Sequence, residues 1–543
     1  MVKFVPAGPK RYQHQMKALH RIIQTRGVTA LLMAPGTGKT AVVIDYLMML
    51  ALKSADDPTL NGEVRALVVS PKNAVDNWVM QVERFGHSDV AVWAEALGGS
   101  ILQKTQTLAN RGPDGYRPQR LARKRDMEDA NYRALNADRA EMTYRSEDVR
   151  GPSYLPKPRL VLTSINLDML SSRAAVGSKT MADVVVDSVR RFQPDVIIVD
   201  ESHRAKGVSS NVSRLLARLS PLTNRRLILT GTVMPHGPMD VFAQWRFLSP
   251  TTFGVADDRG YRKPATFSRF QVRYGIMGGY MGRQVVAYQN LDELEDRMAE
   301  NSIVVKKEDA LDLPPLTRSI VPFQLSSKEQ RAYDDMRRDL VAVIDNQTVS
   351  ASSRLVQMLR LRQITAGFSK DGDNPATVLG STKVDVIDSL ANETLEGEKR
   401  IVVFTAFKYE MEALKNKLAR KGTTVLTIDG DTPTAKRLEY RQRFADTVTH
   451  PERIILIAQV KTMSVSVNEL VTASHAIFAS LTWQRDDFIQ AQDRLHRIGQ
   501  TLPVTVWFPL AQGTVDEAVY GSHVKGTELE TDLLTHIRGV VEP

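Results

Sequence analysis

The sequence predicts an α/β protein built from two lobes, each with a parallel β-sheet at its centre. Short apolar runs alternate with amphipathic stretches in both halves of the 543-residue chain, and such alternation is typical of parallel sheets. The alternation occurs twice, and a segment that contains several Gly and Pro residues separates the two series. The length also exceeds what one hydrophobic core supports, which favours more than one domain.

Ten apolar runs are predicted to be strands. In the first half these are residues 30–34, 66–70, 160–163, 196–199 and 226–230, and in the second half they are residues 400–405, 424–428, 453–457, 476–479 and 504–508. Helices are expected between most of them, for example over residues 41–52 and 409–420. Ser326 and Glu329 have the spacing of a capping box, which predicts the start of another helix.

Domain boundaries follow from where the alternation stops. We expect a first lobe over residues 1–248, a connection over residues 249–320 and a second lobe over residues 321–543. Within the first lobe, residues 100–158 form a basic insertion, and 13 basic and 8 acidic residues lie between positions 101 and 160. The insertion is either a solvated helical surface, which is the simpler interpretation, or an additional contact to nucleic acid.

Composition narrows the function classes. The net charge of +10 and the sequence pI near 9.5 favour a polyanionic partner, with nucleic acid as the first candidate. The absence of cysteine excludes disulfides and thiolate metal sites, and it fits a reducing cytoplasm. The first residues, MVKFVPAGPKRYQHQ, lack the apolar core of a secretory signal. The most apolar stretch is short and contains Asp45, so no membrane span is expected.

A Gly-rich turn follows the first predicted strand, in the segment LLMAPGTGKTAVV at residues 31–43. Glycines let backbone N–H groups approach phosphates closely, and the start of the following helix adds a favourable dipole. Lys39 would reach the outer phosphates and Thr40 would ligate Mg²⁺. The strict P-loop pattern is not met, because Met33 stands at the first Gly position. The predicted ATP-binding loop comprises Pro35, Gly36, Thr37, Gly38, Lys39 and Thr40.

A second strand end supplies carboxylates, since the apolar run 196–199 is followed by DESHRAKG at residues 200–207. Burying carboxylates without a partner is costly, so this end either faces solvent or lies beside positive charge. A P-loop requires an acid for Mg²⁺ at a second strand end. We therefore expect Asp200 to hold Mg²⁺, Glu201 to polarise the attacking water and His203 to couple the site to neighbouring elements. The P-loop and this carboxylate pair are predicted to lie on adjacent strand ends.

Further segments complete a series of motifs in a fixed order. They are YQHQMKAL, APGTGKT, ALVVSPKNAVDNWVMQVERF, LVLTSINLDML, DESHRAKG, LILTGTVMPHG, IVVFTAFKYEMEAL, TIDGDTPTAKR and QAQDRLHRIGQ. Outside residues 100–158, nearly the whole chain resembles a superfamily 2 helicase-like ATPase of the Swi/Snf type. The last string, at residues 490–500, is the most specific part of this resemblance. The resemblance implies two RecA-like lobes with the ATP site in the cleft between them.

The resemblance also implies roles for individual residues at the ATP site. Gln15, or alternatively Gln13, would read the adenine. The second lobe would contribute Gln490, Arg494 and Arg497, and the two arginines would contact the phosphates as bidentate cations. Coupling is assigned to Thr230, Gly231 and Thr232. Because the site would be complete only when the lobes close, ATP binding would close the cleft and hydrolysis would open it.

Contacts to DNA follow from the same resemblance. The implied contact residues are Ser70, Pro71, Lys72, Thr163 and Ser164 in loops of the first lobe, and Asp429, Gly430 and Asn468 in the second. Phosphate contacts carry little sequence information, so we expect largely sequence-independent, salt-sensitive binding of double-stranded DNA, with branched or forked DNA as a further candidate. One departure lies in KTMSVSVNELVTA, residues 461–473, where Met463, Ser464 and Ser466 replace three glycines. This replacement questions how closely that loop approaches its ligands.

The main functional prediction is a DNA-stimulated ATPase that uses ATP and Mg²⁺, translocates along duplex DNA and remodels DNA or DNA–protein complexes. One alternative is a helicase that separates strands or remodels forks and branches. An alternative of another class is an ATP-gated DNA-binding module without turnover, which only the unusual segment 461–473 supports. The chain is short for this family and fits a minimal bacterial or viral member, located in the cytoplasm, or in the host cytoplasm if viral.

Overall fold

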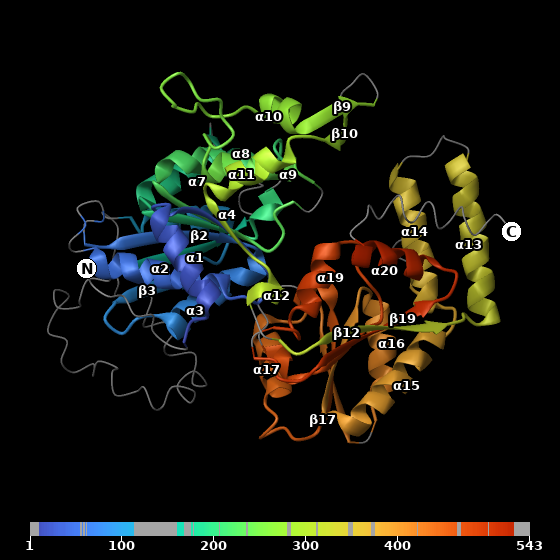
Figure 1. The fold of residues 1–543 in the computed structure, drawn as a ribbon. Coiled ribbons are helices and arrows are strands. Elements are labelled where there is room, and N and C mark those ends of the chain that lie inside the picture. Colours follow the sequence, from blue (N-terminus) through green and yellow to red (C-terminus); the bar gives the residue numbers. More distant parts are fainter. Residues whose placement is uncertain are drawn as a thin grey trace. The chain divides into compact units, whose positions relative to one another are not determined.

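The computed structural model describes most of the chain. The described ranges are 10–54, 57, 60, 62–112, 160–167, 175–176, 179–205, 207–234, 237–279, 284–310, 313–345, 351–370, 375–420, 422–463, 469–497 and 499–525. Most of the predicted basic insertion lies outside them, as does Asn468. The chain divides into two compact units, Met1–Ala310 and Leu311–Pro543 (Figure 1).

Unit 1 is centred on a seven-stranded sheet with the order β11-β1-β8-β7-β2-β4-β3. Its strands are β1 (Val28–Met33), β2 (Val64–Ser70), β3 (Val92–Ala96), β4 (Leu160–Asn166), β7 (Val196–Asp200), β8 (Arg225–Thr230) and β11 (Ser302–Val305). Every neighbouring pair is parallel. The carboxyl ends of parallel strands lie at one edge of a sheet, so the segments that follow them are brought together there.

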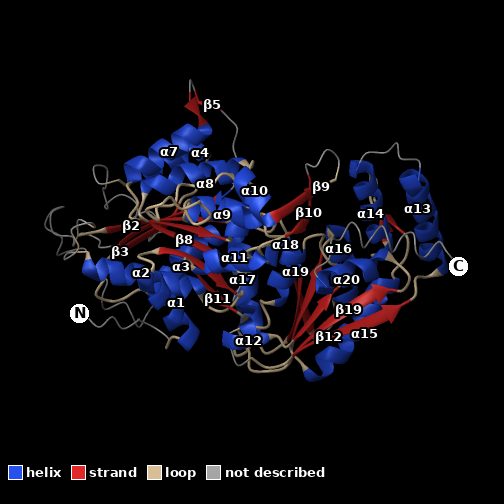
Figure 2. Cartoon of the chain, turned by 45° about the horizontal axis from the view of Figure 1, so that its top comes forward, coloured by secondary structure: helices blue, strands red, loops and turns tan. Residues whose placement is uncertain are grey.

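Helices cover both faces of this sheet, as Figure 2 shows. The helices of unit 1 are α1 (Gln13–Gln24), α2 (Lys39–Lys53), α3 (Val75–Phe85), α4 (Ile101–Ala109), α7 (Met181–Phe192), α8 (Asn211–Leu219), α9 (Asp240–Leu248), α10 (Phe267–Tyr274), α11 (Leu291–Ala299) and α12 (Lys307–Ala310). Side chains of β1 alternate between the two faces: Leu31 and Met33 join the core under α1, α2 and α3, whereas Ala30 and Leu32 join the core under α7, α8 and α9. Burial on both faces explains why these strands are continuous apolar runs.

The predicted connection, residues 249–320, differs from the structure. It contains α10, an antiparallel hairpin of β9 (Gly275–Gly278) and β10 (Gln284–Tyr288), and α11. It then returns to the first sheet, because β11 pairs in parallel with β1. The next strand, β12 (Leu316–Phe323), belongs to the second sheet. The chain therefore divides between Ala310 and Leu311 rather than at residues 248 and 320.

Unit 2 contains a six-stranded parallel sheet with the order β12-β19-β18-β15-β17-β16. Its other strands are β15 (Arg400–Thr405), β16 (Thr423–Ile428), β17 (Arg453–Gln459), β18 (His475–Phe478) and β19 (Val504–Ala511). Its helices are α13 (Ser327–Asp345), α14 (Ala351–Thr365), α15 (Thr382–Gly397), α16 (Lys408–Leu418), α17 (Thr434–Ala445), α18 (Val460–Met463), α19 (Arg485–Gln492) and α20 (Val515–Lys525). The predicted fold class, two α/β units with parallel sheets, is confirmed.

The predicted capping box is also confirmed. The backbone N–H of Ser326 donates to Glu329 Oε2 at 2.9 Å, and the N–H of Glu329 donates to Ser326 Oγ at 3.4 Å. These two bonds satisfy donors that a helix start otherwise leaves free, and α13 begins at Ser327. Searched over the described residues, the chain has no helix that combines the length and the apolar character needed to cross a membrane.

Candidate active site

The predicted ATP-binding loop lies between the end of β1 at Met33 and the start of α2 at Lys39. Gly36 and Gly38 have φ angles of +82° and +91°, in the left-handed region that glycine adopts at little cost. Close packing adds a second requirement, because a Cβ on Gly38 would lie 2.1 Å from Nε2 of Gln15. Gly38 therefore suits the positive φ of the turn, and its missing side chain leaves room for Gln15 of α1.

Helix α1 holds this loop through two side chains. Gln15 is buried, and its Nε2 donates to the carbonyl oxygen of Thr37 at 3.0 Å, while its Oε1 accepts from the N–H of Tyr12 at 3.1 Å. His14 Nε2 lies 2.8 Å from the same carbonyl, which can only accept, so this nitrogen carries the proton. Gln13 is exposed. The structure thus places Gln15 at the loop, and its contact with adenine remains a prediction.

His14 is not among the residues predicted from the sequence. A signal was present, since positions 14, 15, 18, 19 and 22 of α1 share the buried face of the helix. Polar side chains on an otherwise apolar helix face are held by a partner when they are buried.

Asp200 ends β7 and is fixed by two hydrogen bonds. Its Oδ1 accepts from the N–H of Glu201 at 3.0 Å, and its Oδ2 accepts from Nε1 of Trp78 at 3.0 Å. Burial, together with the neighbouring charge of Glu201, raises the pKa of Asp200 to about 6, although the charge of Lys39 opposes this rise. Burial and the charge of Glu201 both disfavour the ionised form of Asp200, and a cation beside the carboxylate would offset them.

These residues fit a Mg²⁺ ion bound together with ATP. Mg²⁺ usually keeps several waters and takes one or two protein oxygens plus phosphates, so Asp200 and Thr40, in the first turn of α2, form an adequate set. Within the described ranges, no group of three or more His, Cys, Asp or Glu side chains has the geometry of a complete metal site. The Nζ of Lys39 donates to the carbonyl oxygen of Met33 at 2.8 Å, so it already lies at the loop.

A polar chain links the carboxylates to the end of β8. Oε2 of Glu201 lies 3.4 Å from Nδ1 of His203, which lies 3.0 Å from Oγ1 of Thr230. The Thr230 hydroxyl donates to the carbonyl oxygen of Thr232 at 2.9 Å, so it accepts from His203, whose Nδ1 carries the proton. Glu201 has a φ of +50°, which is uncommon for a residue with a side chain and often marks a functional site.

The position of β8 corrects one prediction and places the predicted coupling residues between the two motifs. The P-loop and the carboxylate pair do not lie on adjacent strands, because β8 stands between β1 and β7. The residues that follow β8 therefore contact both neighbours. Thr230 meets His203 on one side, and on the other a Cβ on Gly231 would lie 2.7 Å from Cδ of Pro35. The segment 230–232 therefore lies against both the His203 side chain and the ATP-binding loop.

The predicted loop positions of the DNA contacts in unit 1 need correction, whereas the contacts themselves remain predictions. The side chains of Ser70, Thr163 and Ser164 are completely buried, and Pro71 is buried too. Their positions were expected in loops, but β2 continues through Ser70 and β4 extends to Asn166, so all three hydroxyls lie within the sheet. Of these five predicted residues only Lys72 is exposed, and it lies in the short 3₁₀ helix Lys72–Ala74 before α3.

In unit 2, Asp429 forms a turn after β16. Its Oδ1 accepts from the N–H and the hydroxyl of Thr432 at 2.9 and 2.6 Å. Burial alone would raise the pKa of Asp429, but the bonds from Thr432 and the nearby charge of Lys408 outweigh it and lower the pKa. The N–H of Gly430 donates to Gln459 Oε1 at 3.2 Å. Asp429 therefore shapes the turn, and its contact with DNA stays a prediction.

The string at residues 490–500 spans the end of α19 and the turns that follow it. Gln490 is buried, and Arg494 and Arg497 are half-buried. Gln500 anchors the segment, because its Nε2 donates to the carbonyl oxygens of Ala473 at 3.0 Å and Val471 at 3.2 Å. The two arginines are thus carried by a firmly held segment of unit 2, and their contact with ATP phosphates remains a prediction.

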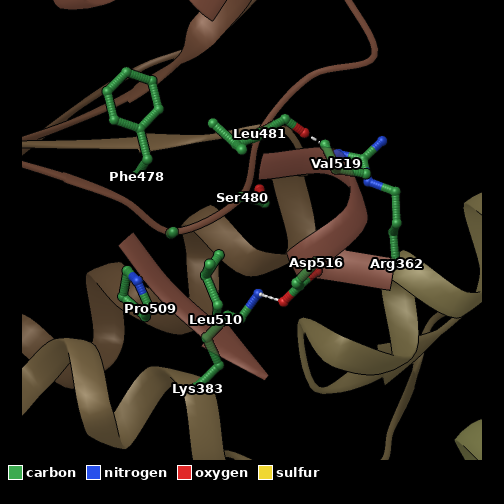
Figure 3. A pocket seen from close by; sticks show the side chains of 10 residues that line it. Arg362, Lys383, Phe478, Ser480, Leu481, Pro509, Leu510, Asp516 and Val519 are labelled. Atoms are coloured by element: carbon green, nitrogen blue, oxygen red, sulfur yellow. Dashed lines mark hydrogen bonds and ion pairs between the residues drawn. The ribbon is translucent and has the colours of Figure 1, made fainter. Parts of the chain in front are cut away.

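Figure 3 shows a small pocket in unit 2 at a buried ion pair. Lys383 Nζ of α15 lies 2.5 Å from Asp516 Oδ2 of α20, and Thr365 of α14 donates to Asp516 Oδ1 at 2.9 Å. Arg362 of α14 donates to the carbonyl oxygen of Leu481. The cavity volume of about 10 Å³ has room for about one water molecule and excludes a nucleotide. This cluster joins helices rather than binding ATP.

Comparison with known families gives two matches. The SNF2-related domain matches residues 14–367, and the helicase conserved C-terminal domain matches residues 382–499. The first match includes the P-loop and the carboxylate pair, and the second includes Gln490, Arg494 and Arg497.

Several curated proteins are similar to this chain. The "DNA annealing helicase and endonuclease ZRANB3" of Bos taurus is 26% identical over 63% of this chain and 30% of its own length. The "SWI/SNF-related matrix-associated actin-dependent regulator of chromatin subfamily A-like protein 1" of Xenopus laevis is 25% identical over 60% of this chain and 31% of its own length. The aligned region thus spans about a third of each relative. A solved structure, "Sulfolobus solfataricus SWI2/SNF2 ATPase core in complex with dsDNA", aligns over 99% of this chain and 95% of that chain at 18% identity, with a TM-score of 0.37.

Proposed function

This chain belongs to the family of proteins with an SNF2-related domain, and on that premise we propose that it hydrolyses ATP with Mg²⁺ and couples hydrolysis to movement along double-stranded DNA. One observation in particular supports the proposal. The ATP-binding loop, the pair Asp200–Glu201 and the contact between His203 and Thr230 all lie at the carboxyl edge of one parallel sheet.

The chemistry at this edge follows from the residues present. The backbone of residues 36–38 and the start of α2 bind the phosphates of ATP. Lys39 would move its Nζ from the carbonyl of Met33 to the outer phosphates. Thr40 and Asp200 would hold Mg²⁺, and the ion would supply positive charge that neutralises the phosphates. Glu201 orients the attacking water and takes its proton, while His203 holds the Glu201 side chain in place.

The second unit completes the reaction in this proposal. Arg494 and Arg497 bind the transferred phosphate and stabilise the charge that develops on it, an effect worth roughly 10³-fold or more in rate. Since both arginines belong to a different unit from Lys39, ATP binding would favour one arrangement of the units and product release another. A cycle of this kind supplies the step along DNA.

A second candidate function is the remodelling of forked or branched DNA. It is favoured by one of the relatives, whose name describes a DNA annealing helicase. Such an enzyme would act on the junction between strands rather than along an uninterrupted duplex. Both candidates require ATP turnover, so they are separated by their DNA substrates and not by the chemistry of the site.

The basic test is ATP hydrolysis by the full chain with and without duplex DNA. We expect duplex DNA to stimulate hydrolysis at least as well as single strands, and RNA not to replace it. The Lys39→Ala variant should lose turnover or nucleotide binding. Nucleotide binding without hydrolysis by the unaltered chain would instead support the ATP-gated module, and a fully active Lys39→Ala variant would disprove the assigned site.

A further inference from the structure

Trp78 contacts the predicted metal ligand directly. It lies on α3, its side chain is completely buried, and its Nε1 donates to Oδ2 of Asp200 at 3.0 Å. The other oxygen, Oδ1, accepts from the N–H of Glu201. One donor therefore acts on each oxygen of the carboxylate. Each oxygen has two lone pairs, so each can still accept a second partner.

Two donors on different oxygens restrict the carboxylate in a way that one donor does not. The torsion that turns an Asp carboxylate is broad and roughly two-fold, so packing alone sets it poorly. Hydrogen bonds from outside the metal site commonly fix the orientation of carboxylate ligands. The backbone donor of Glu201 belongs to the same turn as Asp200, whereas Trp78 comes from a different element, 122 residues away in sequence.

We propose that Trp78 is a positioning residue for Asp200. The indole N–H of Trp78 sets the orientation in which the Asp200 carboxylate holds Mg²⁺. The inference rests on the proposed function, since Asp200 acts on the metal only when ATP is bound. The alternative is that Trp78 only fills the core beneath α3. In that case its large apolar surface would matter and its N–H would not.

Unit 1 offers a matched control for this alternative. Trp245 of α9 is also completely buried, in the core on the other face of the sheet. Its Nε1 has no hydrogen-bond partner among the residues that the structure describes. Replacing Trp245 by Phe therefore removes an indole of the same size from the same unit without breaking a hydrogen bond. The pair Trp78→Phe and Trp245→Phe separates loss of the N–H from loss of volume.

The decisive readout is Mg²⁺-dependent nucleotide binding without turnover. A fluorescent, non-hydrolysable ATP analogue is bound to the full chain at equilibrium, without DNA, and Mg²⁺ is titrated. We expect Trp78→Phe to raise, by roughly 10-fold or more, the Mg²⁺ concentration that gives half of the increase in affinity for the ATP analogue, which is the usual effect of removing such a partner. Binding of the analogue without Mg²⁺ should be unchanged. Trp245→Phe should follow the unaltered chain.

Three results would overturn the inference: an unchanged Mg²⁺ titration for Trp78→Phe, equal shifts in both variants, or no effect of Mg²⁺ on the unaltered chain. Failure of the unaltered chain to hydrolyse ATP would contradict the proposed function instead, because the titration needs no turnover. If Trp78→Phe does not fold, as judged from its melting curve, 3-benzothienylalanine at position 78 keeps the indole shape without the N–H. The same shift is then expected, and its absence overturns the inference.

Discussion

At the scale of single residues, the carboxylates at the end of β7 have unequal environments. Asp200 receives two hydrogen bonds and the field of Lys39, whereas Glu201 adopts a left-handed backbone conformation and lies next to His203. An acid that is fixed in place suits a metal ligand, and an acid beside an imidazole suits the handling of a water proton. The two neighbours can therefore divide the chemistry between them.

This division makes a prediction for Glu201→Gln. The amide cannot take a proton from water, but it preserves the shape of the side chain and leaves Asp200 and the P-loop intact. We expect nucleotide affinity within about 3-fold of the unaltered chain and a loss of turnover of roughly 10²-fold or more. Equilibrium nucleotide binding and steady-state hydrolysis measure the two quantities. Turnover at the original rate would show that Glu201 does not act on the water.

A second residue, Asp195, predicts a pH dependence of stability. Burial raises the pKa of Asp195 to about 6, although the N–H of Arg65, which donates at 2.8 Å, opposes the rise. The folded chain therefore keeps this proton between about pH 4 and 6, where the unfolded chain has lost it, so the contribution to stability falls as pH rises through this window. Asp195→Asn should remove that loss and stabilise the chain at pH 7 by roughly 1–2 kcal/mol.

Chemical denaturation of both proteins at pH 4.5 and pH 7 provides the measurement. The difference in unfolding free energy between Asp195→Asn and the unaltered chain should be larger at pH 7 than at pH 4.5. The amide oxygen can still accept from Arg65, so the variant keeps the local hydrogen bond. A difference that is the same at both values of pH would contradict the assigned shift.

At the scale of elements, the ion pair between Lys383 of α15 and Asp516 of α20 links two helices of unit 2. Lys383 has a side-chain exposure of 2% and Asp516 one of 11%, so removing one partner leaves a charge that water cannot fully reach. Breaking a buried pair from one side typically costs about 3–5 kcal/mol. We expect Lys383→Ala to lower the unfolding free energy by an amount in this range.

The control for this prediction is Lys417→Ala. Lys417 lies 2.7 Å from Asp385, but this pair is largely exposed, with side-chain exposures of 44% and 46%. Exposed pairs contribute about 0–1 kcal/mol, so this variant should melt close to the unaltered chain. Equal losses of stability in the two variants would contradict the role assigned to burial.

The elements also show how far the sequence could predict the structure. All ten predicted strands are present, because strands buried on both faces are continuous apolar runs. The strands of the two large sheets that were not predicted are β3, β11 and β12, and each lies at a sheet edge. Edge strands are partly solvated, so polar residues interrupt the apolar runs of β3 and β12, whereas β11 offers only the three apolar residues 303–305, of which Val304 is 63% exposed. Because β11 was not predicted, the expected domain boundaries differ from the division between Ala310 and Leu311.

The candidate site shows a similar limit. The residue types of the P-loop and of the segment 200–203 predicted the chemistry, because few other patterns place glycines, a lysine and two acids after buried strands. The links between the motifs needed the fold: β8 between β1 and β7, the bond from Trp78 to Asp200, and the burial of Ser70. Sequence spacing does not reveal which strands are neighbours, nor how far a strand continues.

For the chain as a whole, the proposed function combines a basic net charge with ATP hydrolysis by groups from two units. A net charge of +10 favours sequence-independent attraction to DNA, which weakens as salt is added. In the proposed function, the groups that act on ATP belong to both units, so hydrolysis would change how the units are arranged. Contacts to phosphates would then allow movement along any duplex sequence.

Displacement of a third DNA strand distinguishes movement along a duplex from separation of its strands. A triplex-forming strand bound in the major groove is placed ahead of the full chain on a duplex, and its release is compared with the unwinding of a forked duplex. If the chain moves along duplex DNA, we expect ATP-dependent release of the third strand, and we expect Arg497→Ala to abolish this release while DNA binding persists. Efficient unwinding of the fork without any release of the third strand would contradict such movement and support the helicase alternative.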